Sequence, residues 1–293
     1  MNNIRFEDEW DEMCPIYFKN ENTFEQIGTG VLINIFENVY LLTASHVVDD
    51  LYKSKGTSLL IPTKSGFSSI HGEIYHRHLK ESESRDNDKI DFSFYKLSCE
   101  MVRDLHSDFI PLVENKIDFS TDFTTELLQL KDPINYKKIS KSLKEKYTQS
   151  DKISIETTDK MNDVICDITI VFAGFPNTKS KYKNDIHQSE IVYYHGRKLS
   201  SEEYNIHDYD KSINILSEHG KFGVMDSSLT SKNAAKPHGI SGGGVYKIIR
   251  TDSGFDRELI GIGHTYKQQK HLFVGTNINY CINIIKDMLI QYD

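Results

Sequence analysis

Residues 27–48 read IGTGVLINIFENVYLLTASHVV, and this stretch decides the fold class. β-Branched and aromatic residues dominate it, and such residues favour strands. Glu37 and Asn38 interrupt the apolar run, so we expect two antiparallel strands joined by a tight turn at this point. The second strand leads into the small residues 43–45 and then into His46, a residue with acid–base chemistry.

Similar short apolar segments recur along the chain, with turn residues between them. They predict strands at 58–62, 70–76, 92–97, 168–174, 190–194, 244–249, 259–264 and 272–277. Short strands at this spacing are typical of antiparallel barrels and sandwiches, so the sequence predicts an all-β protein.

A clear helical pattern occurs only at the C-terminal end. The segment INYCINIIKDMLIQY at 278–292 places four apolar side chains on one face, which predicts a helix: Ile278, Ile282, Ile285 and Leu289. A weaker and highly charged helical pattern lies at 136–147.

A polar region separates two strand-rich parts of the chain. We interpret this region, residues 116–162, as a connecting segment that carries a regulatory or packing insertion. The predicted organisation is an N-terminal β domain at 1–115 and a C-terminal β domain at 163–293, which includes the final helix.

The composition narrows the class of partner. The chain has 293 residues, with 35 Lys and Arg against 43 Asp and Glu, so the net charge is −8. An acidic balance argues against nucleic acid as a partner. No apolar run approaches the roughly 18 residues of a membrane span, and the first residues lack the layout of a secretory signal. We therefore expect a cytoplasmic protein with no membrane partner.

The four cysteines are far apart and form no C-x-x-C pair: Cys14, Cys99, Cys166 and Cys281. This spacing supports neither a zinc site nor a disulfide framework, so we expect reduced thiols.

Three polar residues stand out because of their surroundings. His46 follows an apolar strand, Asp91 begins an alternating strand pattern, and Ser241 lies in the glycine-rich segment GISGGG at 239–244. Each alone has an ordinary explanation, as a core histidine, a strand-start aspartate and a residue of a flexible loop. Together they supply a base, an orienting carboxylate and a nucleophile.

On these motifs the chain resembles the trypsin-like serine peptidases of the chymotrypsin fold, in particular the bacterial forms without disulfides. The order His, Asp, Ser is also that of the chymotrypsin type. The matching motifs are GTGVLI at 28–33, TASH at 43–46, IDFSFYKL at 90–97, AGFP at 173–176, GISGG at 239–243 and LIGIGH at 259–264. The resemblance extends from residue 28 to about residue 278, but 116–162 and 177–232 match nothing in the family pattern.

The resemblance implies two antiparallel β-barrels with a C-terminal helix and insertions. The first barrel would carry His46 and Asp91 and the second Ser241. In the family's mechanism His46 would be the general base, Asp91 would orient it, and Ser241 would be the nucleophile. The backbone N–H groups of Gly239 and Ser241 would form the oxyanion hole. No metal or organic cofactor is implied. Asp88 is the nearest rival to Asp91, and the remaining histidines are expected at the surface, among them His76, His78, His187 and His207.

The resemblance also implies a substrate pocket built from Ala235, Lys236, His264, Tyr266 and Phe273. Its floor would be Ala235, six residues before Ser241, and without a carboxylate there a preference for Lys or Arg is not expected. Inward-pointing Lys236 and His264 would favour acidic substrates. We favour instead a small apolar pocket narrowed by Tyr266 or Phe273. The implied partner is a protein substrate, since such intracellular peptidases often act on one dedicated partner, for example in bacterial stress or phage defence.

Two other functions remain open. A catalytically inactive protease fold could serve as a binding module, although such proteins usually lose a triad member and none is missing here. The string G-x-S-x-G also occurs in α/β-hydrolase esterases, which require a helix after the serine and the order Ser, Asp, His. Three glycines are a poor helix start, and this reading leaves His46 and Asp91 unused.

Overall fold

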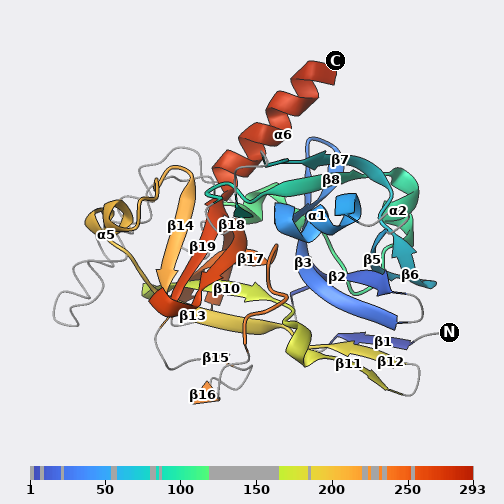
Figure 1. Ribbon diagram of the computed structural model, residues 1–293, viewed down its shortest axis with the longest axis horizontal. Coiled ribbons are helices and arrows are strands. Elements are labelled where there is room, and N and C mark those ends of the chain that lie inside the picture. The colour runs from blue at the N-terminus through green and yellow to red at the C-terminus, as the bar shows by residue number, and fades with distance from the viewer. Residues whose placement is uncertain are drawn as a thin grey trace.

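A computed structural model shows two β-sheet domains, a curled half-barrel and a closed barrel, which lie side by side (Figure 1). The structure describes residues 3–6, 10–20, 23–53, 58–79, 84–85, 88–118, 165–183, 186–219, 224–225, 231–232, 236–251 and 255–292. The expected helix at 136–147 and most of the expected connecting segment lie outside these residues.

The half-barrel is formed by the N-terminal part of the chain. Its strand order is β6-β5-β2-β3-β4-β8-β7, and short β9 runs parallel to β3. The strands are β2 (Met13–Asn20), β3 (Thr23–Ile35), β4 (Asn38–Thr43), β5 (Leu59–Thr63), β6 (Gly66–Ser69), β7 (Gly72–His76), β8 (Ser93–Leu97) and β9 (Leu112–Val113). Phe36 and Glu37 both have positive φ in the β3–β4 turn, as a tight hairpin of right-handed twist requires.

The closed barrel has six antiparallel strands, in the order β10-β17-β18-β19-β14-β13, and pairing of β13 with β10 completes the ring. These strands are β10 (Ile165–Gly174), β13 (Val192–Lys198), β14 (Asn214–Glu218), β17 (Gly244–Thr251), β18 (Phe255–Lys267) and β19 (Leu272–Asn277). Two short strands extend the sheet beyond β13: β15 (Val224–Met225) and β16 (Ser231–Lys232). A separate small sheet joins β1 (Asn3–Phe6), β12 (Ile186–Ser189) and β11 (Ser180–Lys183).

The helices lie at the connections and at the C-terminus. They are α1 (Ser45–Lys53), α2 (Cys99–Asp104), α5 (Ser201–Ile206) and α6 (Ile278–Tyr292), with 3-10 turns at Glu114–Lys116, Asn177–Lys179 and Gln268–Lys270. Helix α6 has the predicted bounds and extends outward from the body (Figure 1). Its predicted apolar face is confirmed, because Ile278, Ile282 and Ile285 are buried.

The expectation of two closed barrels is met only by the second domain. In the part of the chain that the structure describes, β6 and β7 end the first sheet without pairing to each other. Helix α2 lies against the turn between β5 and β6: the Lys64 amide donates to the Asp104 carbonyl at 2.9 Å, and Met101 and the following Leu105 pack into a core cluster of the half-barrel.

One of the buried hydrophobic clusters is formed by both domains together. It combines side chains of the half-barrel, such as Val31, Leu42 and Phe92, with side chains of the barrel and α6, such as Tyr246 and Ile278. This packing fixes one domain against the other. No helix within the described ranges is long and apolar enough to cross a membrane, and Cys14, Cys99 and Cys281 are free thiols.

Candidate active site

His46 and Asp91 meet because their strands pair. β4 lies antiparallel to β8 with Thr43 opposite Ser93. The segment after β4, which contains His46, therefore lies close to the segment before β8, which contains Asp91. The Ser45 hydroxyl strengthens the junction by donating to the Phe92 carbonyl at 2.6 Å. The chain turns into α1 at Ser45, which places His46 in the first helical turn.

The two side chains form a direct pair. His46 Nδ1 lies 2.5 Å from Asp91 Oδ2, and the His46 backbone N–H donates to Asp91 Oδ1 at 3.0 Å. The Asp91 side chain is 1% exposed, whereas that of His46 is 33% exposed. The carboxylate therefore holds the ring from the inside, and part of the ring faces solvent.

The pKa values of Asp91 and His46 are shifted in opposite directions. Burial alone would raise the pKa of Asp91, but its hydrogen bonds with His46 and the charge of that ring outweigh burial and lower the pKa to about 2. Burial alone would lower the pKa of His46, but the hydrogen bond and charge of Asp91, with a contribution from Asp49, raise it above 6.5. Asp91 is thus ionised at neutral pH, and its negative charge favours the protonated form of His46.

Ser241 lies on a loop whose glycines are required by close packing. Gly239 and Gly242 have φ of +95° and +86°, which L side chains rarely adopt. A Cβ at Gly242 would overlap the Thr29 carbonyl and the Thr43 hydroxyl. The loop therefore rests directly on the strands that precede His46, and a flexible surface loop is excluded as the reason for the glycine cluster.

Thr29 of β3 fastens this loop. Its amide donates to the Ser241 carbonyl at 2.9 Å, and its hydroxyl donates to the Gly239 carbonyl at 3.0 Å. The same hydroxyl accepts from the Phe175 amide at 2.9 Å. The Thr29 carbonyl in turn accepts from the Thr43 hydroxyl at 2.9 Å. Thr29 thus joins the half-barrel to two loops of the closed barrel, a role that sequence reasoning missed.

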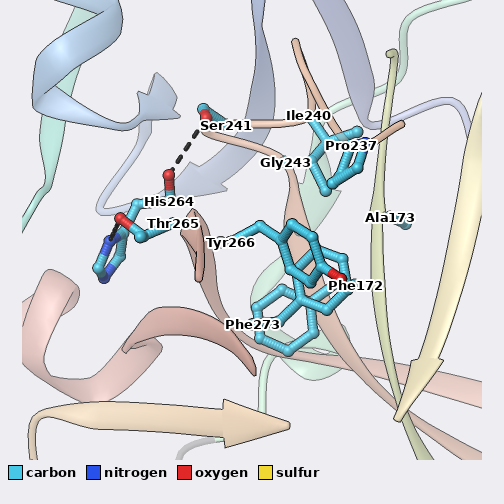
Figure 2. Close-up of a pocket in the computed structure, with 12 residues that line it drawn as sticks. Phe172, Ala173, Pro237, Ile240, Ser241, Gly243, His264, Thr265, Tyr266 and Phe273 are labelled. Atoms are coloured by element: carbon cyan, nitrogen blue, oxygen red, sulfur yellow. Dashed lines mark hydrogen bonds between the residues drawn. The ribbon is translucent and has the colours of Figure 1, made fainter. Parts of the chain in front are cut away.

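The Ser241 hydroxyl donates to the His264 carbonyl at 3.1 Å (Figure 2). Among the described residues it forms no hydrogen bond with His46. A bond between these two side chains therefore requires rotation of the Ser241 side chain.

His264 lines the cavity beside Ser241, as predicted, but its ring does not point inward. Figure 2 shows it turned away from Tyr266 and Phe273. The ring is fully buried, with Nδ1 4.0 Å from Asp91 Oδ2 and 2.9 Å from the Thr265 hydroxyl. Burial lowers the pKa of His264 to about 4, so the ring is neutral at pH 7. Its Nε2 has no hydrogen-bond partner within the described ranges.

A small cavity adjoins Ser241. Its aromatic wall is formed by Phe172, Tyr266 and Phe273, with ring centroids 5.1 Å apart for Phe172–Phe273 and 4.5 Å apart for Tyr266–Phe273. Ile240 and Pro237 complete the apolar lining. The volume open to water-sized molecules is about 20 Å³, roughly that of one water molecule.

Of the other two predicted pocket residues, only Lys236 belongs to the part of the chain that the structure describes. Lys236 is exposed to solvent and does not line the cavity, and Ala235 lies outside the described residues. No acidic side chain is present among the described residues that line the cavity.

The backbone amides of Gly239 and Ser241 are unused as donors. In the part of the chain that the structure describes, neither N–H donates to a protein acceptor. The surrounding backbone is tied down, since the Asn177 amide donates to the His238 carbonyl at 2.8 Å. Two unused donors on a fixed loop suit an anionic oxygen.

Asp88 and His76 are two further polar residues for which the sequence makes a prediction. Asp88, the rival to Asp91, pairs with Arg77 and Arg85 and makes no contact with His46. The expectation that His76 lies at the surface is wrong: its side chain is 3% exposed, and Nε2 lies 2.9 Å from Asp49 Oδ1. The hydrogen bond with Asp49 supplies the buried ring with a polar partner.

No protein-family model and no curated protein sequence matches the chain. Among the described residues no group of three or more His, Cys, Asp or Glu side chains could hold a metal ion. We therefore infer the function of the site from the geometry of its residues.

Proposed function

We propose that the protein is a serine endopeptidase of the chymotrypsin fold, in which His46, Asp91 and Ser241 form the catalytic triad. The observation that supports this most strongly is the His46–Asp91 pair, with its 2.5 Å contact, beside a Ser241 loop fastened by Thr29. The closed barrel and the half-barrel are compatible with that fold.

The reaction begins when Ser241 turns from the His264 carbonyl toward His46. His46 takes the hydroxyl proton as Oγ bonds to the carbonyl carbon of the substrate. The charge that develops on the carbonyl oxygen is stabilised by the N–H groups of Gly239 and Ser241, each worth roughly 3–4 kcal/mol of barrier. His46 then protonates the leaving amine, and water releases the acyl group from Ser241 by the reverse sequence. Asp91 stabilises the protonated ring throughout.

The substrate is a protein or peptide with a small apolar residue on the acyl side of the bond. The cavity beside Ser241 has an aromatic wall and little free volume, so it suits Ala or Val. Lys and Arg are rejected, because their charge would be buried without a carboxylate to pair with it.

A binding module is the second candidate function, and one observation favours it. The Ser241 hydroxyl bonds to the His264 carbonyl rather than to His46. The esterase alternative has no such support. β17 begins at Gly244, so a strand rather than a helix follows Ser241.

Incubation with a mixed peptide library, followed by mass spectrometry of the products, tests the proposal. We expect cleavage by the native chain and none by Ser241→Ala, which keeps the loop backbone. A folded native chain that cleaves no peptide or protein would support the binding module instead.

A further inference from the structure

A cluster of charged side chains adjoins the His46–Asp91 pair and has no part in the proposed reaction. It lies on α1, on β7 and its following residue, and on the segment before Asp91; its members are Asp49, His76, Arg77, Arg85 and Asp88. The Asp88 side chain is 1% exposed and those of Arg85 and Asp49 are 16% and 19% exposed. Charges this far from water are retained only with close partners.

Arg85 is the centre of the cluster. Its Nε donates to Asp49 Oδ2 at 2.8 Å and its Nη2 to Asp49 Oδ1 at 2.7 Å, a two-pronged contact. Nη1 donates to Asp88 Oδ2 at 2.7 Å, and Nη2 also reaches the Arg77 carbonyl at 2.6 Å. Only a planar guanidinium supplies donors in this arrangement, so lysine could not replace it.

Asp49 connects Arg85 to the helix that carries His46, and Asp88 connects it to the segment that carries Asp91. Asp49 lies three residues after His46, one turn along α1. Asp88 accepts from the Ile90 amide at 3.0 Å and also pairs with Arg77, which donates to the Ile90 carbonyl at 2.8 Å. These contacts fix the backbone immediately before Asp91.

We propose that Arg85 is a positioning residue, whose guanidinium holds helix α1 against the turn that carries Asp91 and so sets the geometry of the His46–Asp91 pair. The catalytic role of Arg85 rests on the proposed peptidase function. Its effect on the pKa of His46 can be measured without any substrate.

The charges around His46 also affect its pKa. The ring is surrounded by Asp91, by Asp49 on its own helix, by Arg85, and by neutral His264 on β18. The carboxylates raise the pKa of His46 and the guanidinium of Arg85 lowers it. His76, in contact with Asp49, contributes little charge at neutral pH, since burial lowers its pKa.

The test is an NMR titration of the His46 ring, assigned by its loss in His46→Gln. Arg85→Gln should raise the pKa of His46 and Asp49→Asn should lower it, because one change removes a positive charge and the other a negative one. A structural role alone would not move the two variants in opposite directions. Shifts of the same sign, or no shift in either folded variant, would overturn the inference.

Arg85→Lys separates geometry from charge. It keeps the positive charge, so the direct effect of that charge on the pKa of His46 is retained, but it loses the two-pronged contact. Labelling of Ser241 by a fluorophosphonate should then slow by roughly 10- to 100-fold, as small misplacements of reacting groups do. Native labelling rates in both Arg85 variants would contradict the positioning role while leaving the peptidase proposal intact.

Arg197→Gln is the matched control. Arg197 also makes a two-pronged contact, with Glu203 at 2.6 and 3.0 Å, and it belongs to the closed barrel. Its loss should change neither the pKa of His46 nor the labelling rate. Opposite pKa shifts in Arg85→Gln and Asp49→Asn, together with a native chain that never labels, would keep the inferred effect of this cluster on His46 and reject the peptidase. If Arg85→Gln does not fold, Arg85→Lys and Asp49→Asn still decide the question.

Discussion

Thr29 and Ser241 are 212 positions apart in the sequence, yet the Thr29 amide donates to the Ser241 carbonyl at 2.9 Å. The Thr29 hydroxyl holds the same loop at Gly239. Strand β3, which pairs with the strand that leads to His46, thus carries the anchor of the loop that bears Ser241. The domain interface and the candidate site depend on the same hydrogen bonds.

Thr29→Val tests this anchor. Valine keeps the shape and the amide of residue 29 but removes the hydroxyl, which leaves the Gly239 carbonyl and the Phe175 amide without that partner. We expect a loss of roughly 1–3 kcal/mol in the free energy of unfolding, together with slower labelling of Ser241. Thr29→Ser restores the hydroxyl and should behave like the native chain in urea unfolding. Equal stability of the valine and serine variants would exclude an anchoring role.

Gly242→Ala should be far more damaging than an alanine at another glycine of positive φ. At Gly242 the new methyl group would overlap two oxygens of the half-barrel, and we expect a loss above about 4 kcal/mol. Gly66 has φ +123° with nothing within 4 Å of an added Cβ, so Gly66→Ala should cost only the backbone strain, roughly 1–3 kcal/mol. Comparison of the two unfolding curves separates crowding from strain, and similar losses would show that Gly242 is not crowded.

His264 should make the stability depend on pH. Its pKa is about 4 in the folded protein against 6.5 for the free side chain, so between these values the unfolded chain binds more protons. Stabilisation by neutral His264 is complete above pH 6.5 and is lost as the pH falls toward 4. His264→Gln should reduce this dependence, measured as the difference between native and variant unfolding free energies at several pH values. A constant difference from pH 7 to pH 4 would mean that the ring is not buried as a neutral group.

Tyr266→Ala should widen the cavity beside Ser241. The Tyr266 ring packs on Phe273 at 4.5 Å between centroids and is partly exposed, so its removal spares the barrel core. In peptide-library profiling we expect the preferred residue to change from Ala or Val to Leu or Phe. Dominant cleavage after Lys or Arg in the native chain would show that this cavity does not receive the substrate side chain.

The sequence predicts well those helices and strands whose own residues form a clear apolar pattern. Helix α6 has an uninterrupted apolar face, and β19 begins with three apolar residues and ends at Asn277, so both could be predicted with the correct bounds. β14 was missed because Asn214 and Ser217, both buried, break its apolar pattern. The start of α1 was mistaken for strand because Val47 and Val48 extend the apolar run of β4.

Features that depend on distant contacts could not be predicted in the same way. Closure of a barrel requires pairing between strands far apart in the chain, and nothing in the sequence of β6 or β7 shows that they remain apart. The motifs around His46, Asp91 and Ser241 singled out these residues, but no local signal showed that Arg85 meets Asp49 or that Thr29 holds Ser241. A threonine within an apolar strand and an arginine near an aspartate are too common to indicate a role alone.

Fluorophosphonate labelling followed by peptide mass spectrometry tests most directly whether His46 activates Ser241 as a nucleophile. We expect one covalent adduct, on the peptide that contains Ser241. We also expect no adduct in Ser241→Ala and a rate lower by roughly three orders of magnitude or more in His46→Ala. A folded native chain that forms no adduct, or His46→Ala labelled at the native rate, would contradict activation of Ser241 by His46.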